Sequence, residues 1–238
     1  MLHFIWKHKW VLRSIFKTIY FNFHYLPINQ AYKLPIILYK PHFVRLKGKI
    51  IIEGPIKTGM ISLGRYRVAL YPNNGIVIEN HGGTIIFKGN CSIGNNSFIC
   101  IGPQANVVFG KNFHSTSSLK LASYYNIEFK NNVLCGWDCL FIDTDFHQLT
   151  TLDPASPPPH AYNKIIIGDY CWFAMNNTIL KGTILSDHTI VASQSLLNKD
   201  YSEYNYCLLA GQPAKLKKQG VYLNRDNDII DYSKSKEF

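Results

Sequence analysis

A histidine that follows two aspartates is the strongest candidate for chemistry in this sequence. Asp143, Asp145 and His147 alternate in the segment FIDTDFH, so an extended backbone would place the three side chains on one face. A carboxylate near an imidazole favours the imidazolium and fixes its tautomer. These properties suit a base that takes a proton from a hydroxyl and then passes it to a leaving thiolate. Taken alone, the same string is also typical of a turn with a solvated histidine.

A Pro-rich segment begins directly after His147. Residues 148–164 contain three consecutive prolines and show no apolar periodicity, so they predict an external loop. A long loop on a compact fold is more often functional than decorative, and this loop could cover an active site.

Basic residues gather near the C-terminus. Four lysines follow the last apolar repeat: Lys199, Lys215, Lys217 and Lys218. Convergent cations suit a donor that carries several phosphates, whereas the alternative interpretation is a solvated basic end. Gly211 and Pro213 predict a turn that would bring Lys215 back toward the other lysines.

Several other kinds of chemistry lack support in the sequence. Five further histidines are scattered and form no H-x3-H or H-x4-H pair among themselves: His42, His81, His114, His160 and His188. No cysteine pair has zinc spacing, so no metal is expected. No P-loop, G-x-G-x-x-G or G-x-S-x-G occurs in a strand-to-helix context, which argues against nucleotide hydrolysis, dinucleotide redox chemistry and serine hydrolase activity.

The segment that must position these residues repeats with a period of six. Large apolar residues occupy each first position: Ile167, Phe173, Ile179, Leu185, Val191 and Leu197. Small residues occupy each fifth position: Cys171, Asn177, Thr183, Thr189 and Ser195. Neither an amphipathic helix nor an alternating strand has a period of six. The pattern predicts a parallel β-solenoid, in which the first position fills the interior and the fifth lies at a tight corner.

These hexads, together with a Trp at the edge of a coil, an upstream histidine and the exit sequence AGQPAK, resemble the hexapeptide-repeat acyltransferases. Within that family the chain is most similar to acetyl-coenzyme A dependent sugar and polysaccharide O-acetyltransferases. The resemblance covers residues 129–218 well and residues 50–126 loosely. It implies an all-β, left-handed parallel β-helix that assembles as a homotrimer, with an active site between subunits and acetyl-coenzyme A as co-substrate.

The resemblance also implies roles for individual residues. His147 stands where the family carries its catalytic base, and Asp145 or Asp143 would orient it. The positions that match donor-binding residues are Trp172, Ala174, Met175, Ser193, Asn198, Lys199, Lys215 and Lys218. Asp138 matches an acceptor-contacting Asn, although a carboxylate replaces the amide. His114 is a second candidate for acceptor binding, because it could meet His147 across an interface.

Charge is concentrated at the N-terminal end. The formal net charge is +10, and nine basic residues but no acidic one precede Glu53. Lys9, Arg13 and Lys17 have helical spacing, and apolar residues fill much of the rest of the predicted helix: Trp6, Trp10, Ile15, Ile19 and Phe23. Residues 1–26 could therefore lie in a membrane interface or pack on the apolar surface of the trimer. The segment is predicted to be neither a signal peptide nor a spanning helix, and no nucleic-acid partner is expected.

Three regions are expected. They are a basic aromatic helical arm and lead-in over residues 1–45, a β-helix over 46–200 with the external loop 148–164, and a short C-terminal extension over 201–238. The hexad register is ambiguous between Val107 and Asn126, which predicts longer coils there. Of the six cysteines, Cys135, Cys139 and Cys171 fall on hexad positions, so small buried thiols and a reducing cytoplasm are expected.

The predicted function is acetyl transfer to a sugar hydroxyl in the synthesis of capsular, O-antigen or another surface polysaccharide. The enzyme would be cytoplasmic or peripheral at the inner membrane surface. An amino-sugar N-acetyltransferase or a small-molecule acetyltransferase would share almost the same core. A non-catalytic glycan-binding scaffold is an alternative of another class.

Overall fold

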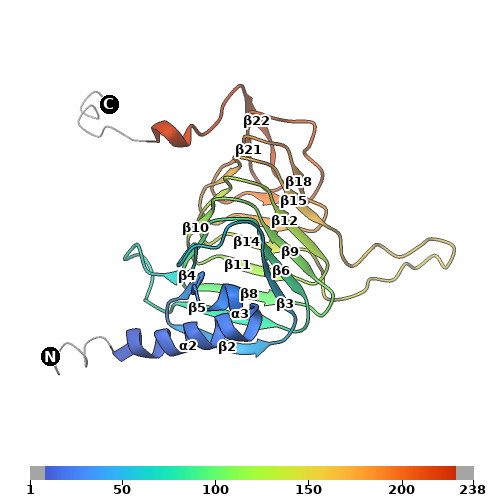
Figure 1. The fold of residues 1–238 in the computed structure, drawn as a ribbon. Helices are drawn as coiled ribbons and strands as arrows, with labels where there is room; N and C mark the ends of the chain where they lie inside the picture. The colour runs from blue at the N-terminus through green and yellow to red at the C-terminus, as the bar shows by residue number, and fades with distance from the viewer. Residues whose placement is uncertain (1–8, 229–238) are drawn as a thin grey trace.

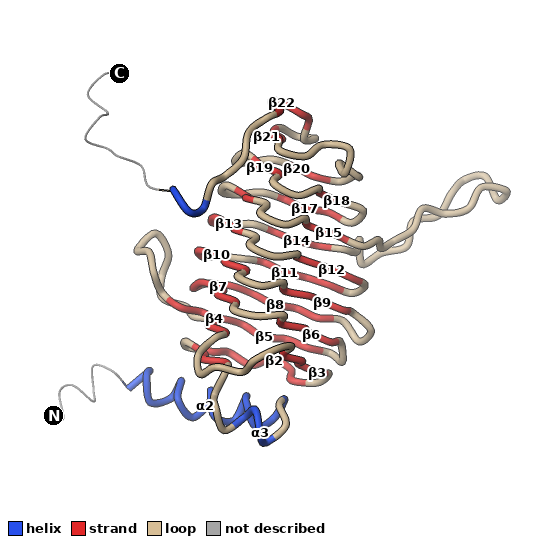
Figure 2. Tube along the Cα trace, turned by 45° about the horizontal axis from the view of Figure 1, so that its top comes forward, coloured by secondary structure: helices blue, strands red, loops and turns tan. Residues whose placement is uncertain are grey.

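The chain winds into a solenoid of triangular cross-section (Figure 1). The computed structural model describes residues 9–228, without the side chains of residues 9–13 and 226. Predictions that rest on Trp6, and on the side chains of Lys9, Trp10 and Arg13, therefore lie outside the described residues. Each coil contributes one short strand to each of three sheets, and the coils stack as rungs in Figure 2. The predicted left-handed parallel β-helix is confirmed.

Three parallel sheets form the faces of the solenoid. The nine-stranded sheet contains β1 (Ile36–Leu38), β4 (Ile61–Arg65), β7 (Cys91–Asn95), β10 (Phe113–Ser117), β13 (Leu134–Trp137), β16 (Trp172–Phe173), β19 (Thr189–Val191), β21 (Cys207–Ala210) and the antiparallel β22 (Lys215–Gln219). The seven-stranded sheet contains β2 (Pro41–Leu46), β5 (Ile76–Asn80), β8 (Ser97–Ile101), β11 (Lys120–Ser123), β14 (Leu140–Ile142), β17 (Thr178–Leu180) and β20 (Leu196–Leu197). The six-stranded sheet contains β3 (Lys49–Ile52), β6 (Thr84–Phe87), β9 (Asn106–Phe109), β12 (Asn126–Phe129), β15 (Ile165–Ile167) and β18 (Ile184–Leu185).

The hexad pattern predicts the core correctly. All six first-position residues from Ile167 to Leu197 are at most 2% exposed, and all five fifth-position residues are buried at corners. Equivalent side chains stack from coil to coil, as in the column Phe87, Phe109 and Phe129, whose neighbouring ring centroids lie 5.3 and 5.4 Å apart. Burial of such columns provides most of the stabilisation of a solenoid.

The corners of the solenoid favour Asn. Residues in the left-handed backbone region recur at equivalent corner positions: Asn96, Ser118, Asp138, Asn176 and Gln194 at one corner, and Asn112, Asn132, Tyr170, His188 and Tyr206 at another. Asn adopts this conformation at lower cost than most residues. The residue that follows each of these positions is buried.

The solenoid is longer than the predicted range 46–200. Its first coil starts at β1, and β21 continues the nine-stranded sheet beyond residue 200. Coil length also varies, as the ambiguous register of residues 107–126 predicts. The strand pairings become closer in sequence along the chain, from Cys91 with Phe113 to Phe173 with Val191, so the early coils are longer than the late ones.

Helix α2 (Lys9–Tyr25) closes the N-terminal end of the solenoid, and the short α3 (Ile28–Ala31) follows it. Polar side chains of α2 bond the free edge of β1: Leu38 N–H donates to Thr18 Oγ1 (3.1 Å) and Ile36 N–H donates to Asn22 Oδ1 (3.1 Å). This contact covers an edge that could otherwise pair with another chain. Over residues 9–228, no helix is both long and apolar enough to cross a bilayer.

All six cysteines are free thiols. Five are buried, as expected for small core residues, and Cys100 on β8 is the half-buried exception.

Candidate active site

One column of outward-facing residues organises the nine-stranded sheet. The strand register stacks them from coil to coil in the order Ile37, Ser62, Ser92, His114, Leu134, Trp172, Ile190, Leu208 and Lys218. Neighbouring strands are about 4.8 Å apart, so His114 and Trp172 are separated by roughly 10 Å along the solenoid. The column connects a cationic cleft at one end with a lysine-rich end at the other.

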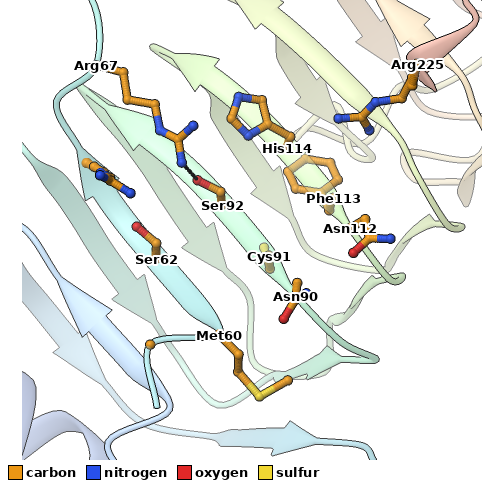
Figure 3. Close-up of a pocket in the computed structure, with 12 residues that line it drawn as sticks. Met60, Ser62, Arg67, Asn90, Cys91, Ser92, Asn112, Phe113, His114 and Arg225 are labelled. Atoms are coloured by element: carbon orange, nitrogen blue, oxygen red, sulfur yellow. Dashed lines mark hydrogen bonds between the residues drawn. The ribbon is translucent and has the colours of Figure 1, made fainter. Parts of the chain in front are cut away.

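The cleft surrounds His114 (Figure 3) and has a volume of about 340 Å³. Arg67 reaches in from the segment after β4 and donates from Nη2 to Ser92 Oγ (3.2 Å), while Arg225 reaches in from the C-terminal segment. Burial, and then the charges of the two guanidiniums, lower the pKa of His114 to about 4. The imidazole is therefore neutral at physiological pH and offers one donor and one acceptor between two fixed cations.

A second cavity of about 650 Å³ continues from the cleft and shares Asn112 and Arg225 with it. Its wall is aromatic: the His188 ring stacks between Tyr170 (4.8 Å) and Tyr206 (4.4 Å). Tyr222 packs edge-on against the same histidine. Rings, amides and a guanidinium in one groove suit a ligand with apolar faces and polar rims, such as a sugar chain.

Asp138 lies at the corner beside β13, and its partner is Tyr71. The Tyr71 hydroxyl donates to Asp138 Oδ2, and burial together with this carboxylate raises the pKa of Tyr71 to about 12. Tyr71 comes from an insertion between β4 and β5, residues 66–75, which runs along the corner past two intervening coils. The hexad pattern does not predict this insertion, although Tyr-Pro-Asn-Asn-Gly is a turn signal.

The predicted donor-binding residues lie toward the other end of the sheet. Trp172 is half-buried on β16 between Leu134 and Ile190, and Ala174 follows the strand. The others are exposed: Met175, Ser193, Asn198, Lys199, Lys215 and Lys218. Lys218 shares the column of Trp172 three strands further on, about 14 Å away. Lys199 instead lies at the corner that follows β20, and its ammonium is 5.3 Å from the centroid of the Tyr201 ring.

His147 lies on the opposite side of the solenoid. It is exposed, and it follows β14 at the corner between the seven- and six-stranded sheets, which is the corner opposite the nine-stranded sheet. The predicted external loop begins here and projects away from the body (Figures 1 and 2). The loop therefore does not fold over the cleft of its own chain.

The base of the loop is held in a defined position. Thr144 and Tyr162 form an antiparallel bridge, and Asp145 N–H donates to the Ala161 carbonyl (2.7 Å). Lys181 donates to Asp145 Oδ2 (2.6 Å) and to the His160 carbonyl. His147 thus extends from a closed hairpin base, and Asp145 already has a cationic partner.

The prediction that Asp143 shares a face with Asp145 and His147 is wrong. Asp143 is fully buried, and its carboxylate accepts hydrogen bonds from Ser123 Oγ (2.7 Å), Tyr124 N–H (2.8 Å) and Tyr125 N–H (3.0 Å). It caps the turn of the coil below. The prediction assumed an extended backbone from Asp143 to His147, but β14 ends at Ile142 and the chain then leaves the coil to form the loop.

No protein-family model matches the chain. The chain is 30% identical over 165 residues to an uncharacterised 24.8 kDa protein in the cps region of Klebsiella pneumoniae, a match that covers 69% of this chain and 72% of that protein.

Solved structures extend the comparison. The polySia-specific acetyltransferase NeuO superposes with a TM-score of 0.54 at 20% identity, over 81% of this chain and 76% of that chain. The polysialic acid O-acetyltransferase OatWY matches at 19% identity over 78% and 88% of the two chains, but its TM-score of 0.36 adds nothing to the argument.

The coils, the corners and the likeness to NeuO define a left-handed parallel β-helix of the hexapeptide-repeat type. The chain is a relative of the Klebsiella pneumoniae cps-region protein, and it has the left-handed β-helix fold of the acetyltransferase NeuO.

Proposed function

We propose that this protein transfers an acetyl group from acetyl-coenzyme A to a hydroxyl of an acidic surface polysaccharide. The observation that carries the proposal is the column of the nine-stranded sheet, in which Trp172 lies between a cationic cleft and a lysine-rich end. NeuO, which shares the fold, is a polySia-specific acetyltransferase, and the curated relative is in a capsule (cps) region. Both relationships favour a polysaccharide over a small-molecule acceptor.

The donor would lie along the upper part of the column. Trp172 offers an apolar surface for the pantetheine arm, with Ala174, Met175 and Ser193 at the adjoining corner. Lys215 and Lys218 would bind the phosphates. Asn198 and Lys199 follow β20 at the opposite corner, so they would reach the donor only from a neighbouring copy. The span of about 14 Å from Trp172 to Lys218 is comparable to an extended pantetheine arm. This arrangement would place the thioester near Trp172, facing the cleft.

The acceptor would lie in the cleft below. Arg67 and Arg225 suit a carboxylated sugar, since a guanidinium recognises a carboxylate by paired hydrogen bonds. Neutral His114 would bond a hydroxyl of the sugar without carrying a charge of its own. Asp138, at the corner that follows β13, would accept from another hydroxyl. The continuous aromatic groove beside the cleft gives room for further residues of a chain.

The base would come from a second copy. His147 and Trp172 belong to opposite sides of one chain, but His147 is on the same coil as Leu134 and Asp138. A rotational axis parallel to the solenoid keeps equal coils at equal height, so His147 of one protomer would meet the Leu134–Asp138 region of its neighbour. A homotrimer closed in this way has three equivalent sites, and an isolated chain has none.

The reaction then needs one base and no covalent enzyme intermediate. The imidazole of His147 removes the proton of the acceptor hydroxyl while the hydroxyl oxygen attacks the thioester carbonyl. A backbone N–H stabilises the oxyanion of the tetrahedral intermediate. Collapse of the intermediate breaks the carbon–sulfur bond, and the imidazolium returns its proton to the thiolate. Asp145, fixed by Lys181, would help to orient the imidazole.

Helix α2 would hold the enzyme at an anionic membrane surface. Its outward face is apolar, because Ser14, Thr18 and Asn22 face the solenoid while Ile15, Phe16, Ile19, Tyr20 and Phe23 are 39–72% exposed. An apolar groove of about 240 Å³, lined by Ile15, Ile19, Leu34 and Ile37, continues this face. Every charged residue before Glu53 is basic. Apolar area flanked by cations is typical of contact with anionic lipid, and buried free thiols fit the cytoplasmic side.

Release of free thiol from acetyl-coenzyme A tests the proposal. Purified protein is incubated with the donor and with matched acidic and neutral polysaccharides, and acetylation of the glycan is confirmed by mass. We expect turnover with an acidic glycan and a loss of about 10²–10⁴-fold in His147→Ala with donor binding retained. Glycan binding without donor binding would instead support the non-catalytic scaffold, and acetylation of an amino sugar would support N-transfer.

A further inference from the structure

A cluster of three metal-binding side chains lies outside the proposed active site, on the seven-stranded sheet. Glu79 on β5 and Cys100 on β8 are register partners in adjacent coils, and His81 follows Glu79 at the end of the strand. One donor atom from each residue lies within 4.8 Å of the other two. From this geometry we propose that Glu79, His81 and Cys100 bind a Zn²⁺ ion that links the second and third coils.

The donor set suits zinc. Thiolate, imidazole and carboxylate are the three ligand types that Zn²⁺ takes in proteins, in tetrahedral geometry with bonds of about 2.0–2.3 Å. Such bonds place ligand atoms roughly 3.3–3.7 Å apart, so the cluster must contract by about 1 Å at its widest. The side chains of His81 and Glu79 remain 28% and 32% exposed, which leaves an entry path and a fourth position for water.

The present hydrogen bonds occupy the place of the ion. His81 Nε2 and Glu79 Oε1 are 2.8 Å apart, and the Cys100 thiol also bonds Glu79. Zn²⁺ would displace the thiol proton to solvent, and the imidazole proton would move from Nε2 to Nδ1 so that Nε2 can bind the ion. Three electron-pair donors would then share one cation.

A nucleophilic Cys–His–Glu triad is the competing interpretation of these residues. In such a triad the thiol bonds the imidazole, and the imidazole lowers the pKa of the thiol. Here the hydrogen-bond partners of the Cys100 side chain are Glu79 and Tyr124. The cluster is therefore arranged for shared coordination and not for attack by the sulfur.

Cobalt substitution tests the site directly, with the full chain, free of affinity tags and reduced. We expect one equivalent of Co²⁺ to give a thiolate-to-cobalt charge-transfer band and intense tetrahedral visible bands, both removed by added Zn²⁺. Cys100→Ser should lose the charge-transfer band, and Glu79→Gln and His81→Gln should weaken Zn²⁺ binding by at least about tenfold. His42→Gln is the matched control, because His42 is an exposed histidine on the same sheet.

A second measurement guards against loss of fold in the variants. Zn²⁺ should raise the midpoint of thermal unfolding of the wild type and of His42→Gln. It should not raise the midpoint of Cys100→Ser, whose circular dichroism spectrum should match that of the wild type. Absence of saturable Co²⁺ binding in the wild type, or a charge-transfer band that persists in Cys100→Ser, would overturn the proposal. Acetyl transfer does not enter either readout.

Discussion

Trp172 and His147 lie on opposite sides of one solenoid. Trp172 faces outward from the nine-stranded sheet, and His147 extends from the corner formed by the other two sheets. The intervening core is filled by fully buried rings such as Phe141 and Phe173. A reaction that uses both residues therefore needs two copies of the chain. The outward projection of the loop from its own body agrees with that requirement.

The lysines at the end of the column should act on the phosphates of the donor. Lys218→Ala should raise the KM for acetyl-coenzyme A by about tenfold, equivalent to about 1.4 kcal/mol, and leave kcat unchanged. Acetyl-pantetheine lacks the phosphates, so its KM should not respond. Lys49→Ala, at the other end of the solenoid, is the control for general electrostatic attraction. Equal effects on the two donors would argue against phosphate binding by Lys218.

Asp143 should contribute to stability and not to orientation of the base. Asp143→Asn removes a buried charge that accepts three hydrogen bonds, so we expect a loss of about 2–3 kcal/mol in the free energy of unfolding. Asp145→Asn breaks an accessible ion pair with Lys181 and should cost less than about 1 kcal/mol. Denaturant unfolding of both variants measures the difference. A larger loss for Asp145→Asn would contradict these assignments.

His114 should make folding stability depend on pH. The pKa of His114 is about 4 in the folded chain, against about 6.5 for an unfolded histidine. Between these values the unfolded chain binds a proton that the folded chain does not. This contribution to stability is complete above pH 6.5 and is lost as the pH falls toward 4.

Substitution of His114 isolates this contribution. His114→Gln should lose less stability than the wild type between about pH 7.5 and pH 5, as measured by urea unfolding. His42→Gln, which removes an exposed histidine, should behave as the wild type. Parallel pH profiles for His114→Gln and the wild type would show that His114 titrates normally.

The outward face of α2 should bind anionic vesicles. Phe16→Glu places a charge at a 72% exposed apolar position and should reduce flotation with vesicles that contain anionic lipid. Phe98→Glu is the matched control, since Phe98 is 40% exposed on the seven-stranded sheet. With neutral vesicles, neither variant should float as strongly as the wild-type protein does with anionic vesicles. Equal flotation of the two variants would exclude α2 as the contact.

The interior of the late coils could be predicted from the sequence because their period is regular. From Ile167 to Leu197 the hexads follow one another without interruption, so a count of six identifies each inward position. The earlier coils are longer, and the external loop interrupts the coil that contains Asp143, so the same count fails there. Coil length depends on corner geometry, and the hexad pattern carries little information about it.

The sequence does not reveal which face of α2 packs on the solenoid, for a different physical reason. Amphipathic analysis assumes that the apolar face is buried. Here the free edge of β1 needs hydrogen-bond partners, so Ser14, Thr18 and Asn22, which recur at helical spacing, face inward. The predicted apolar residues Ile15, Ile19 and Phe23 consequently face outward.

The cleft and the proposed zinc site depend on residues that only the fold brings together. Arg67 and Arg225 are far apart in the sequence, and both approach His114 from segments outside the hexads. Glu79, His81 and Cys100 combine through the offset between two coils, which no spacing rule for zinc ligands describes. A site built from two coils can be predicted only when the strand register between those coils is known. That register depends on the length of each coil.

Complementation between two inactive variants tests the central claim most directly. His147→Ala and Trp172→Asp chains with different affinity tags are co-expressed, and mixed trimers are isolated by both tags in turn. Each mixed trimer contains one site with His147 from one chain and Trp172 from its neighbour, so about one third of wild-type thiol release should return. Each variant alone should remain inactive. Mixed trimers no more active than their parents would contradict a site shared between copies with His147 as its base.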